Sequence, residues 1–314
     1  MMKEKLIVIV GPTAVGKTAL SIELAKRYAG EIISGDSMQV YKGMDIGTAK
    51  VTEAEQQGIT HHLIDIKDPT EAFSVAEFQE LVLPLITKLN EEGKVPILVG
   101  GTGLYVNAIT KQYQLEALPT DETYRSELEQ LVETKGKIEV HNQLKLVDPE
   151  SADKIHPNNI RRVIRALEVT RATGIAFSKQ PKQEETQSPY DLAFVGLTMS
   201  REQLYERINL RVDLMVKQGL LDEVRALYER EVRDCQSVQA IGYKELYGYF
   251  DGSVSLEEAI DSLKQNSRRY AKRQLTWFRN KTDAAWFDTS KGLDSHLFTE
   301  ICSFIEGEIT SIAN

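Results

Sequence analysis

The chain has 314 residues, enough to bury a hydrophobic core in one large domain, or in a domain with a sizeable insertion, without disulfide bonds. Its two cysteines, Cys235 and Cys302, are far apart in the sequence, which excludes a CxxC redox or metal site and favours a reducing compartment. A formal net charge of −9 argues against a general binder of polyanions, although a local basic surface is compatible with it.

Apolar runs and helical patterns alternate at the start of the chain. Residues 5–10 consist of Lys5 and a continuous apolar run, LIVIV, which is typical of a strand buried on both faces of a parallel sheet. A helix ending near Gly30 and a second strand at residues 31–34 complete a β-α-β unit. The run at residues 5–10 is too short for a signal sequence or a membrane span, so we expect a cytoplasmic protein with no membrane partner.

The next elements continue this pattern. Ser74 and Glu77 have the spacing of a helix cap, which predicts a helix from there towards Gly93, with Pro84 as a potential kink. Residues 95–99 and 192–197 predict further buried strands of the same sheet. The predicted fold class is therefore α/β, a P-loop NTPase-like core with a parallel sheet flanked by helices.

The pattern changes between the last two predicted strands. Residues 115–190 contain mostly charged helical stretches and a polar segment, which predict a mostly helical insertion domain. The core domain would then comprise residues 1–114 and 191–314. Capping patterns at Ser200 and Ser255 predict two helices after the returning strand, and the rest of the chain reads as helical.

A phosphate-binding motif follows the first predicted strand. The segment GPTAVGKT fits GxxxxGK[ST] and has the strand and helix flanks that the motif requires. Its backbone N–H groups and the helix N-terminus attract phosphate, Lys17 adds a positive charge, and the Thr18 hydroxyl is a ligand for Mg²⁺, the expected cofactor. The predicted diphosphate-binding residues here are Gly11, Pro12, Thr13, Ala14, Val15, Gly16, Lys17 and Thr18.

A P-loop does not specify the molecule attached to the phosphates, so kinases, NTPases and diphosphate-dependent transferases remain open. The strand at residues 95–99 is followed by glycines rather than by a Walker B aspartate, although Asp65 is a potential substitute. Asp36 follows the second strand, at the sheet edge where ligands bind in open α/β sheets. It is a candidate general base, but its spacing alone favours a turn or a helix cap.

Several longer segments together closely resemble the tRNA dimethylallyltransferase family. These segments are GPTAVGKT, ISGDSMQVYKGMDIGTAK, HHLID, GGTGLYV, HPNNIRRVIRALEV, AIGYKEL and AKRQLTWFRNK, and they span nearly the whole chain in order. The resemblance implies transfer of a dimethylallyl group from dimethylallyl diphosphate to N6 of the adenosine just 3′ of the anticodon of tRNA. The chain lacks the C-terminal zinc-finger extension of eukaryotic relatives, so it resembles the bacterial form, and we expect a monomer.

The resemblance also implies roles for individual residues. Asp36 would be the general base, with Lys17 and Thr18 as further catalytic residues, and an arginine would help hold the diphosphate. Both Arg207 and Arg211 fit that arginine. The residues with an implied tRNA contact are Asp36, Ser37, Met38, Gln39, Thr102, Arg125, Ile160, Arg161, Arg162, Val163 and Ile164.

A basic stretch near the C-terminus is a further candidate tRNA surface. The interval from Lys264 to Lys281 contains seven basic residues, no Asp or Glu, and interleaved aromatic residues. Lys272 and Arg273 are its predicted tRNA contacts, although a solvated helix face explains such a run equally well. The histidines are adjacent or isolated and predict no metal site.

The alternative functions are a small-molecule or nucleoside kinase, a nucleic-acid-binding switch, and a prenyltransferase acting on free adenine nucleotides. A kinase would use the same P-loop on ATP and would need no tRNA. The long insertion and the basic stretch favour a macromolecular acceptor.

Overall fold

The computed structural model describes residues 3–113, 121–180, 188–310 and 312. The chain divides into two compact units, residues 1–112 with 186–314, and residues 113–185. Among the described residues, no helix combines the length and the apolar character needed to cross a membrane.

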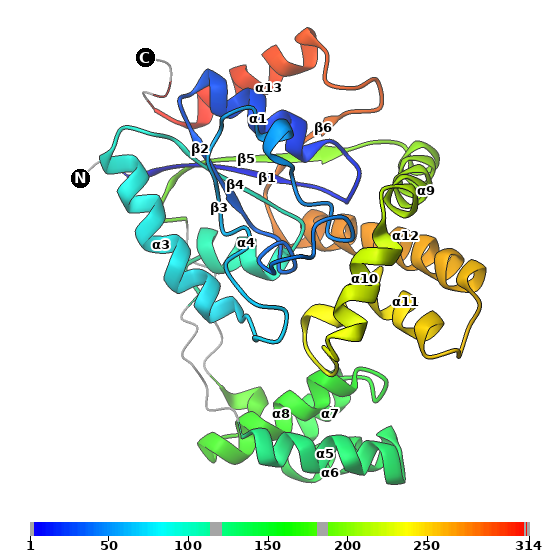
Figure 1. Cartoon of the computed structure of the whole chain (residues 1–314). Coiled ribbons are helices and arrows are strands. Elements are labelled where there is room, and N and C mark those ends of the chain that lie inside the picture. The colour runs from blue at the N-terminus through cyan, green and yellow to red at the C-terminus, as the bar shows by residue number, and fades with distance from the viewer. Residues whose placement is uncertain (1–2, 114–120, 181–187, 311, 313–314) are drawn as a thin grey trace. The chain divides into compact units, whose positions relative to one another are not determined.

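The larger unit is built on a six-stranded parallel sheet with the strand order β3-β2-β4-β1-β5-β6 (Figure 1). The strands are β1 (Lys5–Val10), β2 (Glu31–Ser34), β3 (His61–His62), β4 (Pro96–Gly100), β5 (Asp191–Thr198) and β6 (Ala285–Asp288). The α/β prediction and the return of β5 to the same sheet are confirmed. Because the strands are parallel, the loops after β1, β2 and β4 lie at the same edge of the sheet. The chain adds β2, β3 and β4 on one side of β1 and β5 and β6 on the other, and ligands bind at such a switch point in open α/β sheets.

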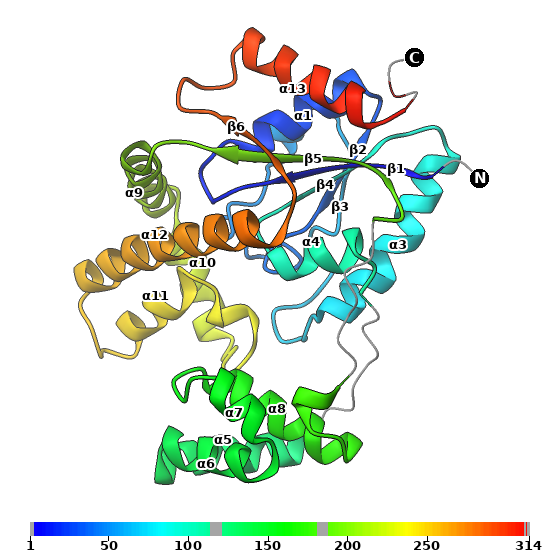
Figure 2. The ribbon, with the colours of Figure 1, turned by 180° about the vertical axis from the view of Figure 1, so that it is seen from behind.

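The position of β1 at the centre of the sheet explains why its sequence is apolar after Lys5. Ile7 and Ile9 pack into a core with α1 (Lys17–Arg27) and α13 (Ser295–Glu308), whereas Leu6 and Val8 pack into a second core on the opposite face. Figures 1 and 2 show α1 and α13 covering one face of the sheet, and α3 (Val75–Glu91) and α4 (Gly103–Thr110) covering the other. A strand covered on both faces has no solvent side on which to place polar residues.

Side-chain caps lie at the starts of several predicted helices. Ser74, Ser200 and Ser255 each accept a hydrogen bond from the backbone N–H three residues later, at the starts of α3, α9 and α12. Helix α3 continues through Pro84. The other helices of this unit are α2 (Glu53–Gln56), α9 (Arg201–Lys217), α10 (Leu220–Glu229), α11 (Tyr243–Phe250) and α12 (Leu256–Lys281).

The smaller unit is helical and has its own core. Its helices are α5 (Glu122–Lys135), α6 (Lys137–Val147), α7 (Pro149–Lys154) and α8 (Ile160–Thr173). Leu128, Val140, Leu144 and Val163 are buried together in this core. The predicted polar segment after α8 falls partly at residues 181–187, which lie outside the described residues.

Two strands were not predicted from the sequence. The chain after Ser255 was expected to be helical, but β6 forms between α12 and α13 and pairs with β5. The two-residue strand β3 pairs with β2 at the other edge of the sheet. β3 has two residues, which is too few for a hydrophobic pattern, and the four residues of β6 lack the consecutive β-branched residues that mark β2. Pairing with a neighbouring strand defines both.

Candidate active site

A cavity of about 570 Å³ lies in the larger unit where β1, β2 and β4 end. Its lining includes the P-loop residues 13–18, residues 36–39 and 47–49, residues 99–101, Arg211 on α9, residues 239–241, and Tyr270, Arg273 and Gln274 on α12. The volume falls within the usual range for small-molecule sites. The cavity therefore joins the predicted phosphate loop to the candidate base Asp36.

The P-loop has the geometry of a phosphate cradle. Gly11 has φ 147° and Gly16 has φ 107°, values that favour glycine, and a Cβ at Gly11 would lie 2.6 Å from the Leu197 carbonyl oxygen. Gly16 is the N-cap of α1, so the helix N-terminus opens directly onto the loop. The Lys17 Nζ donates to the carbonyl oxygens of Gly11 at 2.9 Å and Pro12 at 2.8 Å.

Two cations meet in this cavity. Burial, with a contribution from Arg211, lowers the pKa of Lys17 to about 8. Burial also lowers the pKa of Arg211, whose Nη1 donates to the Thr13 Oγ1 at 3.4 Å. Two neighbouring cations that repel each other provide a favourable site for an anion. Arg211 lines this cavity and Arg207 is not among its lining residues, so the geometry favours Arg211 as the diphosphate-binding arginine.

Asp36 is both a turn residue and a candidate general base, the two roles that the sequence left open for it. Its Oδ1 accepts a hydrogen bond from the Met38 backbone N–H at 2.8 Å, which is the turn that its spacing favoured. Its carboxylate also lines the cavity with Lys17 and Arg211. Burial raises the pKa of Asp36 above its usual range, opposed by the Met38 N–H and by Lys17. A cavity carboxylate with increased proton affinity is suited to accept a proton.

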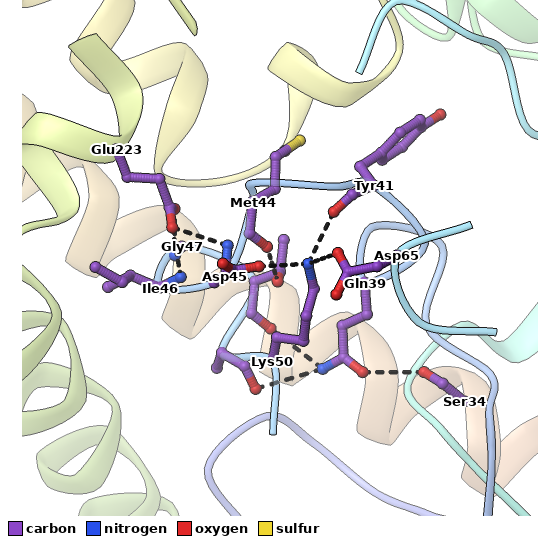
Figure 3. A network of polar contacts seen from close by, with 12 residues as sticks. Ser34, Gln39, Tyr41, Met44, Asp45, Ile46, Gly47, Lys50, Asp65 and Glu223 are labelled. Carbon is purple, nitrogen blue, oxygen red and sulfur yellow. Dashed lines mark hydrogen bonds and ion pairs between the residues drawn. The ribbon is translucent and has the colours of Figure 1, made fainter. Parts of the chain in front are cut away.

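The loop after Asp36 is held by its own polar contacts, which Figure 3 shows from close by. The Gln39 Nε2 donates to the carbonyl oxygens of Thr48 at 3.3 Å and Ala49 at 3.4 Å, and the Ser34 Oγ donates to the Gln39 Oε1 at 2.9 Å. The tRNA contact that the resemblance implies for Gln39 stays a prediction, and in this structure its side-chain amide is engaged within the chain. It therefore shapes the cavity wall.

Asp65 does not take the place of a Walker B aspartate. Its carboxylate pairs with the buried Lys50 at 2.5 Å, and Lys50 also contacts Asp45 at 2.5 Å and donates to the Tyr41 carbonyl oxygen at 2.8 Å (Figure 3). Asp65 is not among the residues that line the cavity. The contacts of this acidic residue lie within the loop.

Two polar residues that the sequence analysis missed hold the P-loop. The buried Gln274 of α12 accepts from the Thr13 backbone N–H at 2.9 Å and donates to the Gly101 carbonyl oxygen at 3.1 Å. The buried Thr289, just after β6, donates to the Val15 carbonyl oxygen at 3.0 Å. From the sequence, the only signal for Gln274 is an uncharged polar residue between basic and apolar residues of a helical stretch.

Helix α12 carries the predicted basic stretch, and part of it is used within the fold. Lys264 pairs with Asp213 at 2.6 Å, and the Arg268 Nη1 donates to the Asn209 Oδ1 at 2.6 Å. Among the aromatic residues of the stretch, Phe278 is fully buried and the Trp277 ring packs against Gly103, where a Cβ would meet it. Tyr270 lines the cavity. Lys272 and Arg273 are exposed, and Arg273 also lines the cavity. Thr102 follows the lining residue Gly101 directly and occupies the N-cap position of α4 without a side-chain capping hydrogen bond.

The implied tRNA contacts of the smaller unit differ in exposure. Val163 and Ile164 are buried in the core of this unit, so their side chains serve packing. The Arg125 Nε pairs at 2.9 Å with Glu168, whose side chain is 1% exposed, and this ion pair satisfies a buried charge. Arg161 and Arg162, in the first turn of α8, are exposed.

The residues present fit a magnesium ion held through phosphate. The Thr18 hydroxyl belongs to a residue that lines the cavity. Among the described residues no group of three or more His, Cys, Asp or Glu side chains could hold a metal ion. Mg²⁺ commonly keeps several waters and binds through substrate phosphates with one or two protein ligands, so it does not require such a group. His62 pairs with Glu31, and His61 and His141 contact backbone carbonyl oxygens.

Comparison with known proteins gives a consistent result. The profile of the IPP transferase family matches residues 39–281. A tRNA dimethylallyltransferase of Halalkalibacterium halodurans is 61% identical over 310 residues, covering 98% of each chain. The crystal structure of a tRNA isopentenylpyrophosphate transferase from Bacillus halodurans superposes with a TM-score of 0.75 at 60% identity, covering 98% of this chain and 97% of that one.

A eukaryotic dimethylallyltransferase acting on tRNA is 34% identical with a TM-score of 0.75, covering 91% of this chain and 74% of that one. The similarity thus extends over nearly the whole chain in bacterial relatives, and the resemblance stated from the motifs is confirmed. This chain belongs to the IPP transferase family of tRNA dimethylallyltransferases.

Proposed function

We propose that this tRNA dimethylallyltransferase transfers the dimethylallyl group of dimethylallyl diphosphate to N6 of the adenosine at tRNA position 37, giving N6-(dimethylallyl)adenosine. The observation that carries the proposal is one cavity in which the P-loop, Lys17, Arg211 and Asp36 converge. This cavity holds both the groups that can stabilise an anionic leaving group and a carboxylate that can accept a proton.

The donor diphosphate would bind the P-loop N–H groups, Lys17 and Arg211. When the allylic C–O bond breaks, its electron pair leaves with the diphosphate and positive charge develops on the allylic carbon. Cations and oriented N–H groups placed at the departing oxygen stabilise that charge without having to reorganise during the reaction. Mg²⁺, when held by Thr18 and the phosphate oxygens, would supply further positive charge to the leaving group.

Asp36 would act as the general base on the acceptor. The adenine N6 is a weak nucleophile because its lone pair is delocalised into the ring. As the new N–C bond forms, the Asp36 carboxylate takes one of the N6 protons, so the product amine is neutral. Positioned proton transfer of this kind contributes roughly 10²–10⁴-fold to a rate.

The acceptor adenine has to leave its stack to enter the cavity, so we propose that the enzyme flips it out of the anticodon loop. The exposed Lys272 and Arg273 on α12 are candidates for contacting tRNA phosphates. The exposed Arg161 and Arg162 make the smaller unit a candidate for the anticodon stem. We expect the enzyme to be a monomer, and light scattering tests this.

The test of this function is mass analysis of tRNA after incubation with dimethylallyl diphosphate and Mg²⁺. We expect one added dimethylallyl group per acceptor tRNA, located next to the anticodon by nuclease digestion, with diphosphate released only when tRNA is present. Parallel reactions with AMP as acceptor and with ATP as donor are the controls. Prenylation of AMP but not tRNA, or phosphate transfer from ATP without a prenyl product, would overturn the proposal.

A further inference from the structure

The Glu223 carboxylate, in the first turn of α10, accepts hydrogen bonds from backbone N–H groups of a loop that is distant in the sequence. Its Oε2 accepts from the N–H groups of Asp45 at 2.8 Å and Ile46 at 2.7 Å, and its Oε1 accepts from the Gly47 N–H at 2.9 Å (Figure 3). The Oε1 also accepts from the Tyr243 hydroxyl at 2.6 Å. Consecutive N–H groups directed at one point form an anion-binding nest, and here the anion is a side chain of the same chain.

These contacts join two segments of the cavity wall. Gly47 lines the cavity together with its neighbours Thr48 and Ala49. Tyr243 lies between the lining residues Ile241 and Lys244, and its ring is so close to Gly47 that a Cβ there would lie 2.5 Å from it. Glu223 does not line the cavity itself, so it acts on the site through the residues that it holds.

The same loop begins at the candidate base. Asp36 starts the turn that leads into residues 37–50, and the Gln39 side chain ties that turn to the carbonyl oxygens of Thr48 and Ala49. A displacement of residues 45–47 would therefore move both the cavity wall and the support of Asp36. The P-loop is held separately, by Gln274 and Thr289.

We propose that Glu223 is a positioning residue for the acceptor side of the reaction, which it serves by fixing residues 45–49 and 239–244 at the distance that the reacting adenine requires. The inference rests on the proposed function. Diphosphate binding and positioning of the acceptor then depend on different residues: the P-loop and Arg211 bind the diphosphate, and Glu223 fixes the cavity wall next to the base. Removal of its charge should slow the chemical step and leave diphosphate binding unchanged.

The central variant is Glu223→Gln, which keeps the size of the side chain but replaces a carboxylate oxygen with an NH₂ group that opposes the loop N–H donors. At saturating tRNA and donor, we expect the single-turnover rate to fall ~10–100-fold, since a misplacement of about 1 Å at a reacting centre has effects of this size. Affinity for inorganic diphosphate, measured by calorimetry, should equal that of the wild type. Glu223→Asp, which retains the charge, should recover part of the rate.

Glu229→Gln is the matched control, because Glu229 is an exposed residue at the other end of α10. If Glu223→Gln fails to fold, Tyr243→Phe removes only the hydroxyl donor and should show a smaller loss of rate with the same unchanged diphosphate affinity. A wild-type rate in the folded Glu223→Gln or Tyr243→Phe variant, or an equal loss of rate and diphosphate affinity, overturns the inference. A wild-type enzyme that prenylates no tRNA overturns the proposed function instead.

Discussion

Asp36 is the residue on which the proposed chemistry depends most directly. Asp36→Asn keeps the shape and the turn acceptor, since the amide oxygen can still accept from the Met38 N–H, but it cannot take a proton. Single-turnover rates should fall by ~10²–10⁴-fold, with tRNA affinity nearly unchanged. Retention of the wild-type rate would make Asp36 a structural turn residue and place the base elsewhere.

Lys17 should make diphosphate binding depend on pH. Because its pKa is lowered to about 8, we expect this side chain to be partly neutral near pH 8 in the free enzyme and mostly charged below about pH 7. An anion favours the protonated form and raises that pKa, so binding inorganic diphosphate at pH 8 should be accompanied by proton uptake, and affinity should weaken as the pH rises.

Calorimetry in two buffers of different ionisation enthalpy measures the proton uptake. Lys17→Ala should bind diphosphate weakly and should take up fewer protons on binding than the wild type. Lys88→Ala, at an exposed position on α3, should behave like the wild type. Identical proton uptake in wild type and Lys17→Ala would assign it to another group.

The two candidate arginines on α9 can be separated experimentally. Arg211→Ala removes a cation that lines the cavity, so diphosphate affinity and the transfer rate should both fall, because the charge acts in the ground state and in the transition state. Arg207→Ala is the matched variant on the same helix and should change diphosphate affinity little. The reverse order of effects would reassign the diphosphate contact to Arg207.

At the scale of elements, helix α12 supports the P-loop through Gln274. Gln274→Leu would leave the Thr13 N–H and the Gly101 carbonyl without this partner in a buried position. Each unsatisfied buried group costs about 1–3 kcal/mol, so the melting temperature should decrease, and the misplaced loop should bind diphosphate more weakly. Gln265→Leu, at an exposed position of the same helix, provides the comparison for thermal unfolding and calorimetry. Equal diphosphate affinity in both variants would limit Gln274 to a stabilising role.

At the scale of the whole molecule, the helical unit should contribute electrostatic binding to tRNA. The double variant Arg161→Ala, Arg162→Ala should bind tRNA more weakly and with a shallower salt dependence, since each lost phosphate contact reduces the slope by about 1. Binding of inorganic diphosphate should stay as in the wild type. Filter binding over a range of salt concentrations measures the slope.

The charge-matched control for this variant is Lys137→Ala, Lys145→Ala, which removes two exposed positive charges from α6 of the same unit. Loss of both tRNA and diphosphate binding in the arginine variant would mean that these arginines support the fold. An unchanged salt slope would locate the tRNA phosphates on another surface, with the exposed Lys272 and Arg273 as the first residues to test.

Features that depend on neighbours in the sequence could be predicted from the sequence alone. The buried strand β1, the P-loop and the caps at Ser74, Ser200 and Ser255 are local, because a strand buried on both faces, a phosphate-binding turn and a helix start each depend on a few consecutive residues. The family resemblance was equally accessible, since the order of several motifs along the chain carries it.

Other features required the tertiary structure, because they join residues that are far apart in the chain. The sequence left Arg207 and Arg211 equivalent, and only the packing of α9 brings Arg211 to Thr13. It offered no reason to connect Glu223 with residues 45–47, or Arg125 with Glu168, and the fold brings both pairs together. Local pattern specifies which groups a segment can offer, but long-range packing decides which of them meet, since distances across the core are set by how whole elements pack.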